Sequence, residues 1–366
     1  MPTGAPAGKR LYHVDLMKSL AIYFVLAFHC TLYPNRIFPD MPLPLLLRYF
    51  SRTILSTCVP LFFFVNGYLL FGRPTNLKKH TFKTLKLMLV TCFWIVFLLA
   101  VMQYFHQEPI SWQELQEDLW TLKDGWNNQL WFLGVLVGIY LVFPPLKAAF
   151  DTNRSSFYWF TAVLAAMVFG SNLYDHCMTL FNLLVKKEFW LYQNNLPVFS
   201  MFMPFTYLTK GGLAYFCLGG VAWALEERLL QFSALWRNLA AAAGMTGCCL
   251  ILGILGWRYS LYSNALWDVV WNGYFTVFTL GNVLGIYVLS LNLKRELPLL
   301  RQIAANSMGI YLLHDLVHKT IRPPLRPIEF LRTLPGSLLY AALVLLLTLG
   351  ICRLLKKIPV IRQLIS

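Results

Sequence analysis

The sequence predicts an all-α polytopic membrane protein with about ten transmembrane helices around a polar central cavity. Apolar residues make up 58% of the 366 residues and charged residues only 13%, which is too little polar surface for a soluble globule of this size. Apolar runs near the roughly 20 residues that cross a bilayer recur along the chain. We place them at 14–33, 53–71, 86–105, 130–148, 157–174, 197–224, 239–257, 273–292, 304–321 and 335–355.

The first run follows only a short polar segment. It is longer than the apolar core of a signal peptide, and no small-residue cleavage pattern ends it, so we expect it to be retained. The loops between later runs are short and hold proline, glycine, asparagine and most of the charges. None is long enough for a soluble domain, so residues 1–366 are predicted to form a single membrane domain.

The net charge of +15 is spread over the loops, which argues against nucleic-acid binding and makes the basic residues markers of topology. An even number of spans puts both termini on one side. The positive-inside rule makes this side cytoplasmic, because its loops hold "GRPTNLKKHTFKTLK", Lys147, Arg154, Arg228, Arg237, Lys294, Arg295, Arg301 and the tail from Arg353 to Arg362.

The loops on the opposite side are acidic or mixed, as in "HQEPISWQELQEDLWTLKDGWNNQ" and the segment near Lys186. One loop is an exception, because it places basic residues on that side, namely Lys319, Arg322, Arg326 and Arg332. Either these residues bind something anionic or the last helices are counted wrongly.

The first run carries three ionisable residues. Lys18 and His29 are eleven residues apart, which on an α-helix is about three turns, roughly 16 Å of rise and an angular offset of about 20°. Asp15 precedes Lys18 by three, a spacing at which helix side chains meet, so we expect an Asp15–Lys18 pair. Charged groups in a span usually face a protein interior or a wet cavity. The alternative is that Asp15 and Lys18 are interfacial anchors and His29 bonds a neighbouring helix.

A hydrated imidazole titrates near neutrality, so His29 is suited to take a proton from a hydroxyl group and return it to a leaving group. The other histidines, except His314, are expected in loops or at interfaces; they are His13, His80, His106, His176 and His318. The eight cysteines lie mostly in apolar runs without Cys-x-x-Cys spacing. We therefore expect neither a disulfide framework nor a metal site.

Four segments in order resemble the acyltransferase 3 family of integral-membrane enzymes. They are "VDLMKSLAIYFVLAFH", "RYFSRTILSTCVPLFFFVNGYLLF", "NNQLWFLGVLVGIYLVFPPL" and "ANSMGIYLLHDLV". Asn66-Gly67 stands where the family often has Ser-Gly. Trp131-Phe132-Leu133 has no acid nearby, unlike some branches. These departures favour the branch of enterobacterial-antigen-type O-acetyltransferases.

The resemblance implies an O-acetyltransferase of the bacterial inner membrane. It would move an acetyl or other acyl group from cytoplasmic acetyl-CoA, a substrate and not a bound cofactor, to a hydroxyl group of an extracytoplasmic glycan or glycolipid. The acceptor, the choice between acetyl, succinyl and longer groups, direct transfer against an acyl-histidine intermediate, and the oligomeric state stay open.

On this reading His29 is the general base, Lys18 keeps the inner mouth positive and Asp15 orients Lys18. His314, in "YLLHDLVH", is a second catalytic candidate that would line the same cavity. An acyl-CoA donor also needs a cytoplasmic basic cluster for its phosphates.

Lys83 and Lys86 match, with lysine for arginine, the basic pair that the family often carries after its second span. Lysine binds phosphate as a point charge without the bidentate grip of arginine. The alternative for both residues is contact with lipid headgroups. The remaining substrate-site candidates are Arg52, Trp131 and Asn66, whose amide could donate to a developing oxyanion or join two helices.

A secondary transporter or a lipid or glycan flippase is the rival function, because such proteins also bury ionisable residues. Transporters often show inverted repeats, and this chain shows no convincing internal symmetry. Turnover of labelled acetyl-CoA by the purified protein separates the two classes.

Overall fold

The computed structural model describes residues 10–30, 50–106, 111–113, 116, 128–181, 185, 207–263 and 273–365. Every regular element in this part of the chain is a helix. The helices are α1 Tyr12–His29, α3 Cys58–Phe71, α4 Leu77–His106, η1 Asn128–Leu130, α6 Trp131–Thr152, α7 Arg154–Ala165, η2 Ala166–Gly170, α8 Ser171–Phe181, α10 Tyr207–Leu230, α11 Ala234–Ser263, α12 Val277–Ser290, α13 Pro298–Leu325, η4 Glu329–Arg332, α14 Leu334–Leu355 and α15 Pro359–Leu364.

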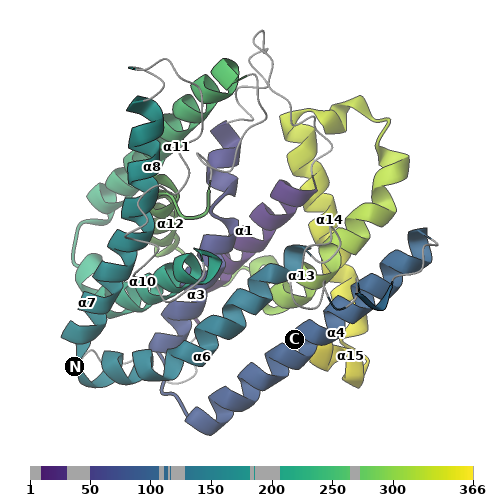
Figure 1. Cartoon of the computed structure of the whole chain (residues 1–366), viewed down its shortest axis with the longest axis horizontal. Helices are drawn as coiled ribbons and strands as arrows, with labels where there is room; N and C mark the ends of the chain where they lie inside the picture. Colours follow the sequence, from purple (N-terminus) through teal and green to yellow (C-terminus); the bar gives the residue numbers. More distant parts are fainter. Residues whose placement is uncertain are drawn as a thin grey trace.

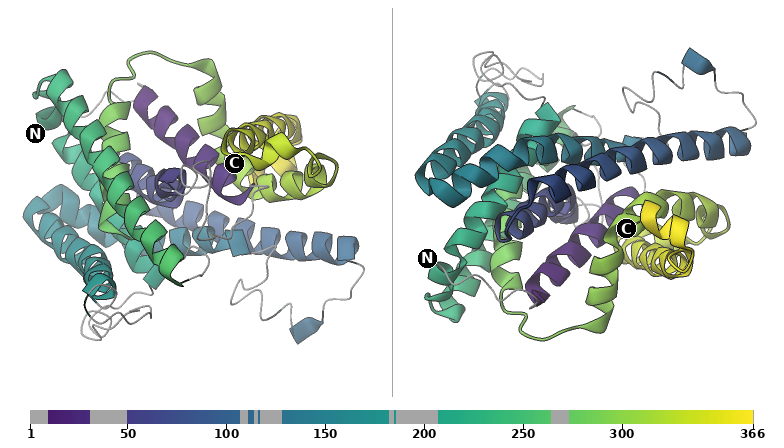
Figure 2. Two further views of the ribbon diagram at one scale, coloured as in Figure 1. Left: turned by 90° about the horizontal axis from the view of Figure 1, so that it is seen from above. Right: turned by 90° about the horizontal axis from the view of Figure 1, so that it is seen from below.

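Figure 1 shows α1 near the middle of the molecule, between a group that contains α10, α11 and α12 and a group formed by α13, α14 and α15. The long helix α4 lies beside α6, and the two views of Figure 2 agree with this arrangement. Helix α1 packs against α3, α12, α13 and α14. The helix with the predicted catalytic residues is therefore an inner helix.

Among the described residues, six helices are long and apolar enough to cross a membrane: Phe50–Phe71, Leu77–Val101, Trp131–Thr152, Arg154–Met178, Ala234–Ile254 and Leu334–Leu355. Each of the ten predicted runs overlaps a helix of the structure, although 31–33 and 197–206 lie outside the described residues. Six of the ten predicted spans therefore correspond to helices that could cross a membrane by their length and composition, and the count of ten is not confirmed. The acidic segment 107–127 and the segment near Lys186 are also largely outside the described part.

The four other helices that match predicted runs are α1, α10, α12 and α13. Helix α12 has 14 residues, or about 21 Å at the α-helical rise, which is short of a bilayer core of about 30 Å. Helices α1, α10 and α13 carry several ionisable residues each. Because α1 is surrounded by other helices, its polar residues contact protein and need not meet lipid.

Helices α3 and α10 approach each other closely through two glycines. A Cβ atom at Gly67 would overlap the backbone carbonyl of Phe216, and one at Gly219 would overlap the carbonyl of Phe64. Small residues allow this backbone contact, which is a common way to pack helices in membranes. Gly67 thus has a packing role beside Asn66 of the predicted site.

A buried polar cluster joins α1, α3, α10 and α12. The Tyr68 hydroxyl donates a short hydrogen bond to the Glu226 carboxylate, and the Tyr287 hydroxyl lies 3.1 Å from the same oxygen. Nε2 of His13 lies 3.1 Å from the Tyr68 oxygen. Because Tyr68 donates to Glu226, His13 is the donor to Tyr68. These bonds satisfy groups from four helices at once.

Candidate active site

A cavity of about 400 Å³ lies between α1, α3, α4, α6 and α13. Four predicted site residues line it, namely Lys18, Asn66, Lys83 and Lys86. They come from three helices. The structure thus brings together the cation of the first helix and the basic pair that the sequence assigns to the donor.

The cavity is positively charged. Lys18 and Lys86 are half-buried and Lys83 is exposed, and no residue that lines the cavity is acidic. No carboxylate of the described residues lies within 4.0 Å of any of the three ammonium groups. Three like charges that share a cavity with low-dielectric walls attract an anion.

Two histidines lie beyond one wall of this cavity. Tyr311 of α13 lines the cavity, and its ring centroid is 6.0 Å from that of His314. The His314 ring in turn lies 5.4 Å from the His29 ring, at an interplanar angle of 61°. The structure therefore joins the cavity to His29 through Tyr311 and His314, and His29 itself is not among the residues that line the cavity.

His314 has one ring nitrogen occupied and one free. Its Nδ1 lies 2.6 Å from the backbone carbonyl of Tyr311, and a carbonyl only accepts, so Nδ1 carries the proton. In the neutral ring Nε2 then holds a lone pair. Nε2 is buried and has no hydrogen-bond partner among the described residues, which is uncommon for a buried polar atom.

His29 ends α1, and its side chain is exposed although His314 beside it is fully buried. The His29 ring is thus open to a molecule from outside the helix bundle, and it also lies against the buried ring of His314. Arg52 packs on the residue before His29, with its guanidinium over the ring of Phe28 at 4.8 Å from the centroid.

The predicted pair of Asp15 with Lys18 is not formed in the described residues. Asp15 instead accepts two hydrogen bonds from Arg10, at 2.6 and 3.1 Å. The guanidinium fork matches a carboxylate better than an ammonium group does. Lys18 is therefore left to the cavity, and Asp15 does not orient it through a direct contact.

Asn66 and Trp131 make packing contacts. The Asn66 amide donates to the carbonyl of Phe62 at 2.8 Å and accepts from the Tyr140 hydroxyl at 3.2 Å, so it joins α3 to α6. Trp131 stacks on Tyr274 with centroids 5.9 Å apart and is not among the residues that line the cavity, whereas its neighbour Phe132 is.

Four histidines expected in loops or at interfaces are buried, namely His13, His80, His176 and His318. That expectation is wrong because each ring has a polar neighbour within the fold. Nε2 of His80 lies 2.8 Å from the carbonyl of Tyr140, and Nδ1 of His318 lies 3.0 Å from the Tyr340 hydroxyl. The side chain of His106 lies outside the described residues.

Sequence reasoning missed part of the cavity wall on α13. Ser307 and Tyr311 line the cavity, and His314 follows on the same helix face. The spacing of four and then three residues is that of one helix stripe. This signal is present in "NSMGIYLLH", but it is also typical of ordinary helix packing.

Helices α1 and α13 run in the same general direction. Lys18 shares the cavity with Ser307, and eleven residues later His29 contacts His314. Helix α13 then continues past the histidines to Leu325. The unexpected basic residues therefore lie at the His29 end, with Lys319 paired to Asp315 at 2.7 Å and the exposed Arg322, Arg326 and Arg332 beyond it.

The chain matches the family model described as "Acyltransferase domain" over residues 11–356. This range includes the cavity and both histidines. No curated protein and no solved structure matches the chain.

Proposed function

The chain belongs to the acyltransferase family, and on this premise we propose that it moves an acetyl group from cytoplasmic acetyl-CoA to a hydroxyl group of an extracytoplasmic glycan or glycolipid. The same proposal assigns it to the bacterial inner membrane with both termini in the cytoplasm. The observation that carries the proposal is the cavity in which Lys18, Lys83 and Lys86 converge close to a pair of histidines.

The lysine cavity is assigned to the donor. CoA carries several phosphate groups, and the three ammonium groups supply the opposite charge without a competing carboxylate within 4.0 Å in the described residues. Lys83, which is exposed, meets the nucleotide end first. The thin pantetheine arm then extends along the cavity toward Tyr311, with the thioester at its tip.

His29 is assigned to the reaction itself. Its imidazole takes the proton of the acceptor hydroxyl as the oxygen attacks the thioester carbonyl carbon, and the new C–O bond forms as the C–S bond breaks. The proton on His29 then passes to the departing CoA thiolate, which leaves as the thiol. An acyl-histidine intermediate is the rival route, in which His29 attacks the thioester first.

His314 acts through His29 in this proposal and is a positioning residue. A neutral imidazole has one N–H group and one lone pair. If the N–H of His29 turns toward the free Nε2 of His314, the lone pair of the other His29 nitrogen faces the acceptor. The buried, unpartnered state of that Nε2 among the described residues supports this assignment.

The acceptor approaches at the exposed face of His29, on the side away from Lys18. The Tyr311 ring lines the donor cavity and lies next to His314, so it must shift before the thioester reaches His29. The two substrates therefore enter from opposite ends of α1 and meet at His29.

The test uses the full chain reconstituted in liposomes with radiolabelled acetyl-CoA. We expect release of free CoA and, with envelope glycans extracted from a strain that lacks the gene, transfer of label to those glycans. Mass spectrometry of glycans from strains with and without the gene should show a difference of one acetyl unit. A protein that consumes no acetyl-CoA and leaves these glycans unchanged in mass would contradict the proposal.

A further inference from the structure

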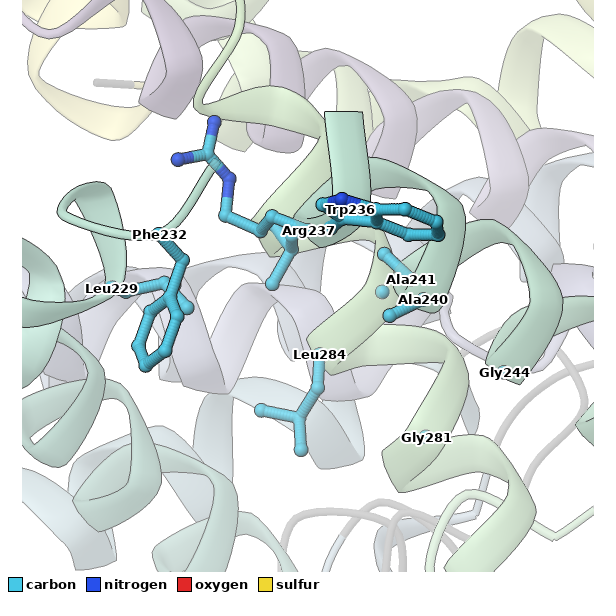
Figure 3. A pocket seen from close by; sticks show the side chains of 11 residues that line it. Leu229, Phe232, Trp236, Arg237, Ala240, Ala241, Gly244, Gly281 and Leu284 are labelled. Atoms are coloured by element: carbon cyan, nitrogen blue, oxygen red, sulfur yellow. The ribbon is translucent and has the colours of Figure 1, made fainter. Parts of the chain in front are cut away.

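A second cavity shares no lining residue with the lysine cavity. It is a groove of about 460 Å³ between the end of α10, the start of α11 and α12. Figure 3 shows Phe232 and Trp236 at its two sides, Arg237 between them and Leu284 opposite. We refer to it as the α11 groove.

The α11 groove lies on a helix with an exposed apolar surface. The stretch Ala234–Ile254 of α11 is apolar enough to cross a bilayer, and only 17% of it is buried inside the protein. An exposed apolar surface of this kind is suited to contact lipid. Arg237 belongs to the first turns of this helix, on the side that the basic loops mark as cytoplasmic.

Glycines create the groove. On α12, a Cβ atom at Gly281 would lie 2.6 Å from the sulfur of Cys248, and one at Gly285 would overlap Met245. These two glycines therefore let α11 approach α12. Gly244 of α11 is different, because a Cβ atom there would meet nothing within 4 Å although Gly244 lines the groove. Its missing side chain leaves open space.

Arg237 is the single charged residue among the described residues that line the groove. Its Nη2 donates to the Asn292 side chain at 3.2 Å, while its Nε is buried without a hydrogen-bond partner in the described part of the chain. No described carboxylate lies within 4.0 Å of the guanidinium. A half-buried cation without an acidic partner among the described residues, at the end of an apolar groove, fits a ligand with an anionic head and a hydrocarbon tail.

We propose that the α11 groove binds one anionic glycerophospholipid of the cytoplasmic leaflet, with an acyl chain between Phe232 and Trp236 and the phosphate on Arg237. Charge complementarity selects this occupant over a zwitterionic lipid, because the cationic group of a zwitterionic headgroup offsets the attraction of its phosphate to Arg237. The bound lipid holds α11 against α12, which in turn packs against α1 and α3. This proposal is independent of the acyl-transfer reaction.

The test is native mass spectrometry of the detergent-purified full chain, titrated with phosphatidylglycerol or phosphatidylcholine of identical acyl chains. We expect about tenfold tighter binding of one phosphatidylglycerol, because both lipids offer a phosphate to Arg237 but the choline cation of phosphatidylcholine is repelled by the guanidinium. Arg237→Gln should remove the preference, whereas Arg228→Gln, at an exposed arginine outside the groove, should keep it.

Gly244→Leu fills the groove and should weaken binding of both lipids. The matched control is Gly247→Leu, because a Cβ atom at Gly247 of α11 would also meet nothing within 4 Å, but Gly247 does not line the groove. Equal binding of the two lipids to the unchanged protein overturns the proposal, as does a Gly244→Leu protein that binds lipid like Gly247→Leu. A dimer that Gly244→Leu converts to a monomer also overturns it, because the occupant is then a second copy of the chain.

Discussion

The rings of His29 and His314 lie 5.4 Å apart, although His29 is exposed at the end of α1 and His314 is fully buried in α13. One imidazole is thus available to a substrate, and the other is shielded with a fixed proton on Nδ1. Two rings in such different surroundings suit two different tasks. The proposed roles of base and positioning residue follow from this difference.

His29→Gln should lower kcat by about 10²- to 10⁴-fold, the usual contribution of a general base. His314→Gln should lower kcat less and should also change the pH profile of kcat, because it alters the setting of His29 and not the reacting group. Both are measured as release of CoA from acetyl-CoA by protein of normal gel-filtration behaviour. Full activity of His29→Gln would refute its assignment.

Lys83→Gln and Lys86→Gln should each raise KM for acetyl-CoA by roughly three- to tenfold with little change in kcat, because a phosphate contact is lost while the reacting groups stay in place. Added salt should reduce the difference in KM between each variant and the unchanged protein, because salt screens the attraction between lysine and phosphate. Lys78→Gln is the control, since Lys78 is exposed on the same helix and does not line the cavity. An equal effect at Lys78 would show that the loop charge as a whole, and not the cavity, binds the donor.

Tyr311→Phe and Tyr311→Ala should separate two roles of one side chain. The Tyr311 hydroxyl donates a short hydrogen bond to the carbonyl of Gln129, so Phe should cost about 1 kcal/mol of stability and leave transfer largely intact. Ala removes the wall between the donor cavity and His314, so it should raise the ratio of acetyl-CoA hydrolysis to acetyl transfer. An unchanged ratio would show that Tyr311 does not separate donor from water.

Gly67→Ala should destabilise the protein by about 1–3 kcal/mol, the range for overpacking a close contact, because the new Cβ atom overlaps the Phe216 carbonyl. Gly134→Ala is the control. It lies within α6, where a Cβ atom meets nothing within 4 Å, so it should be neutral or slightly stabilising. Thermal unfolding in detergent measures both, and similar melting temperatures would contradict the close packing of α3 on α10.

Glu226→Ala should destabilise by about 1–3 kcal/mol, because the Tyr68 hydroxyl loses its acceptor, whereas the Tyr287 hydroxyl keeps the carbonyl of Ala222 at 3.2 Å. Glu227→Ala tests the loss of a neighbouring charge, since Glu227 is exposed, and should change the melting temperature little. If the two variants melt alike, the cluster does not stabilise the helix contacts.

Hydropathy predicts where the helices lie along the chain. It predicts less well where each helix ends and whether that helix crosses the membrane. Helix α4 begins at Leu77, nine residues before the apolar run at 86, because lysine-rich segments form helix outside the hydrocarbon as well. From its charge alone, Lys147 is predicted to lie in a loop. It lies within α6, is buried, and donates to the carbonyl of Phe71 at 3.1 Å.

Part of the site is predictable because helix periodicity and the family resemblance restrict where side chains can lie. Lys18, Lys83 and Lys86 meet in one cavity although their helices are separated in the chain. The partner of Asp15 is not predictable, because Arg10 precedes the apolar run and spacing alone favours Lys18. The free Nε2 of His314 also could not be foreseen, since it depends on the packing of α13.

Lys18 and His29 belong to one continuous helix, so the separation between the anion-attracting mouth and the imidazole is set by backbone rise, roughly 16 Å. Helix α1 therefore fixes the distance that the donor arm must span from the lysines to His29. One residue inserted between these positions would turn His29 by about 100° and advance it by about 1.5 Å. No rotamer change restores that register, so a single-residue insertion here should be more harmful than most substitutions along the same helix.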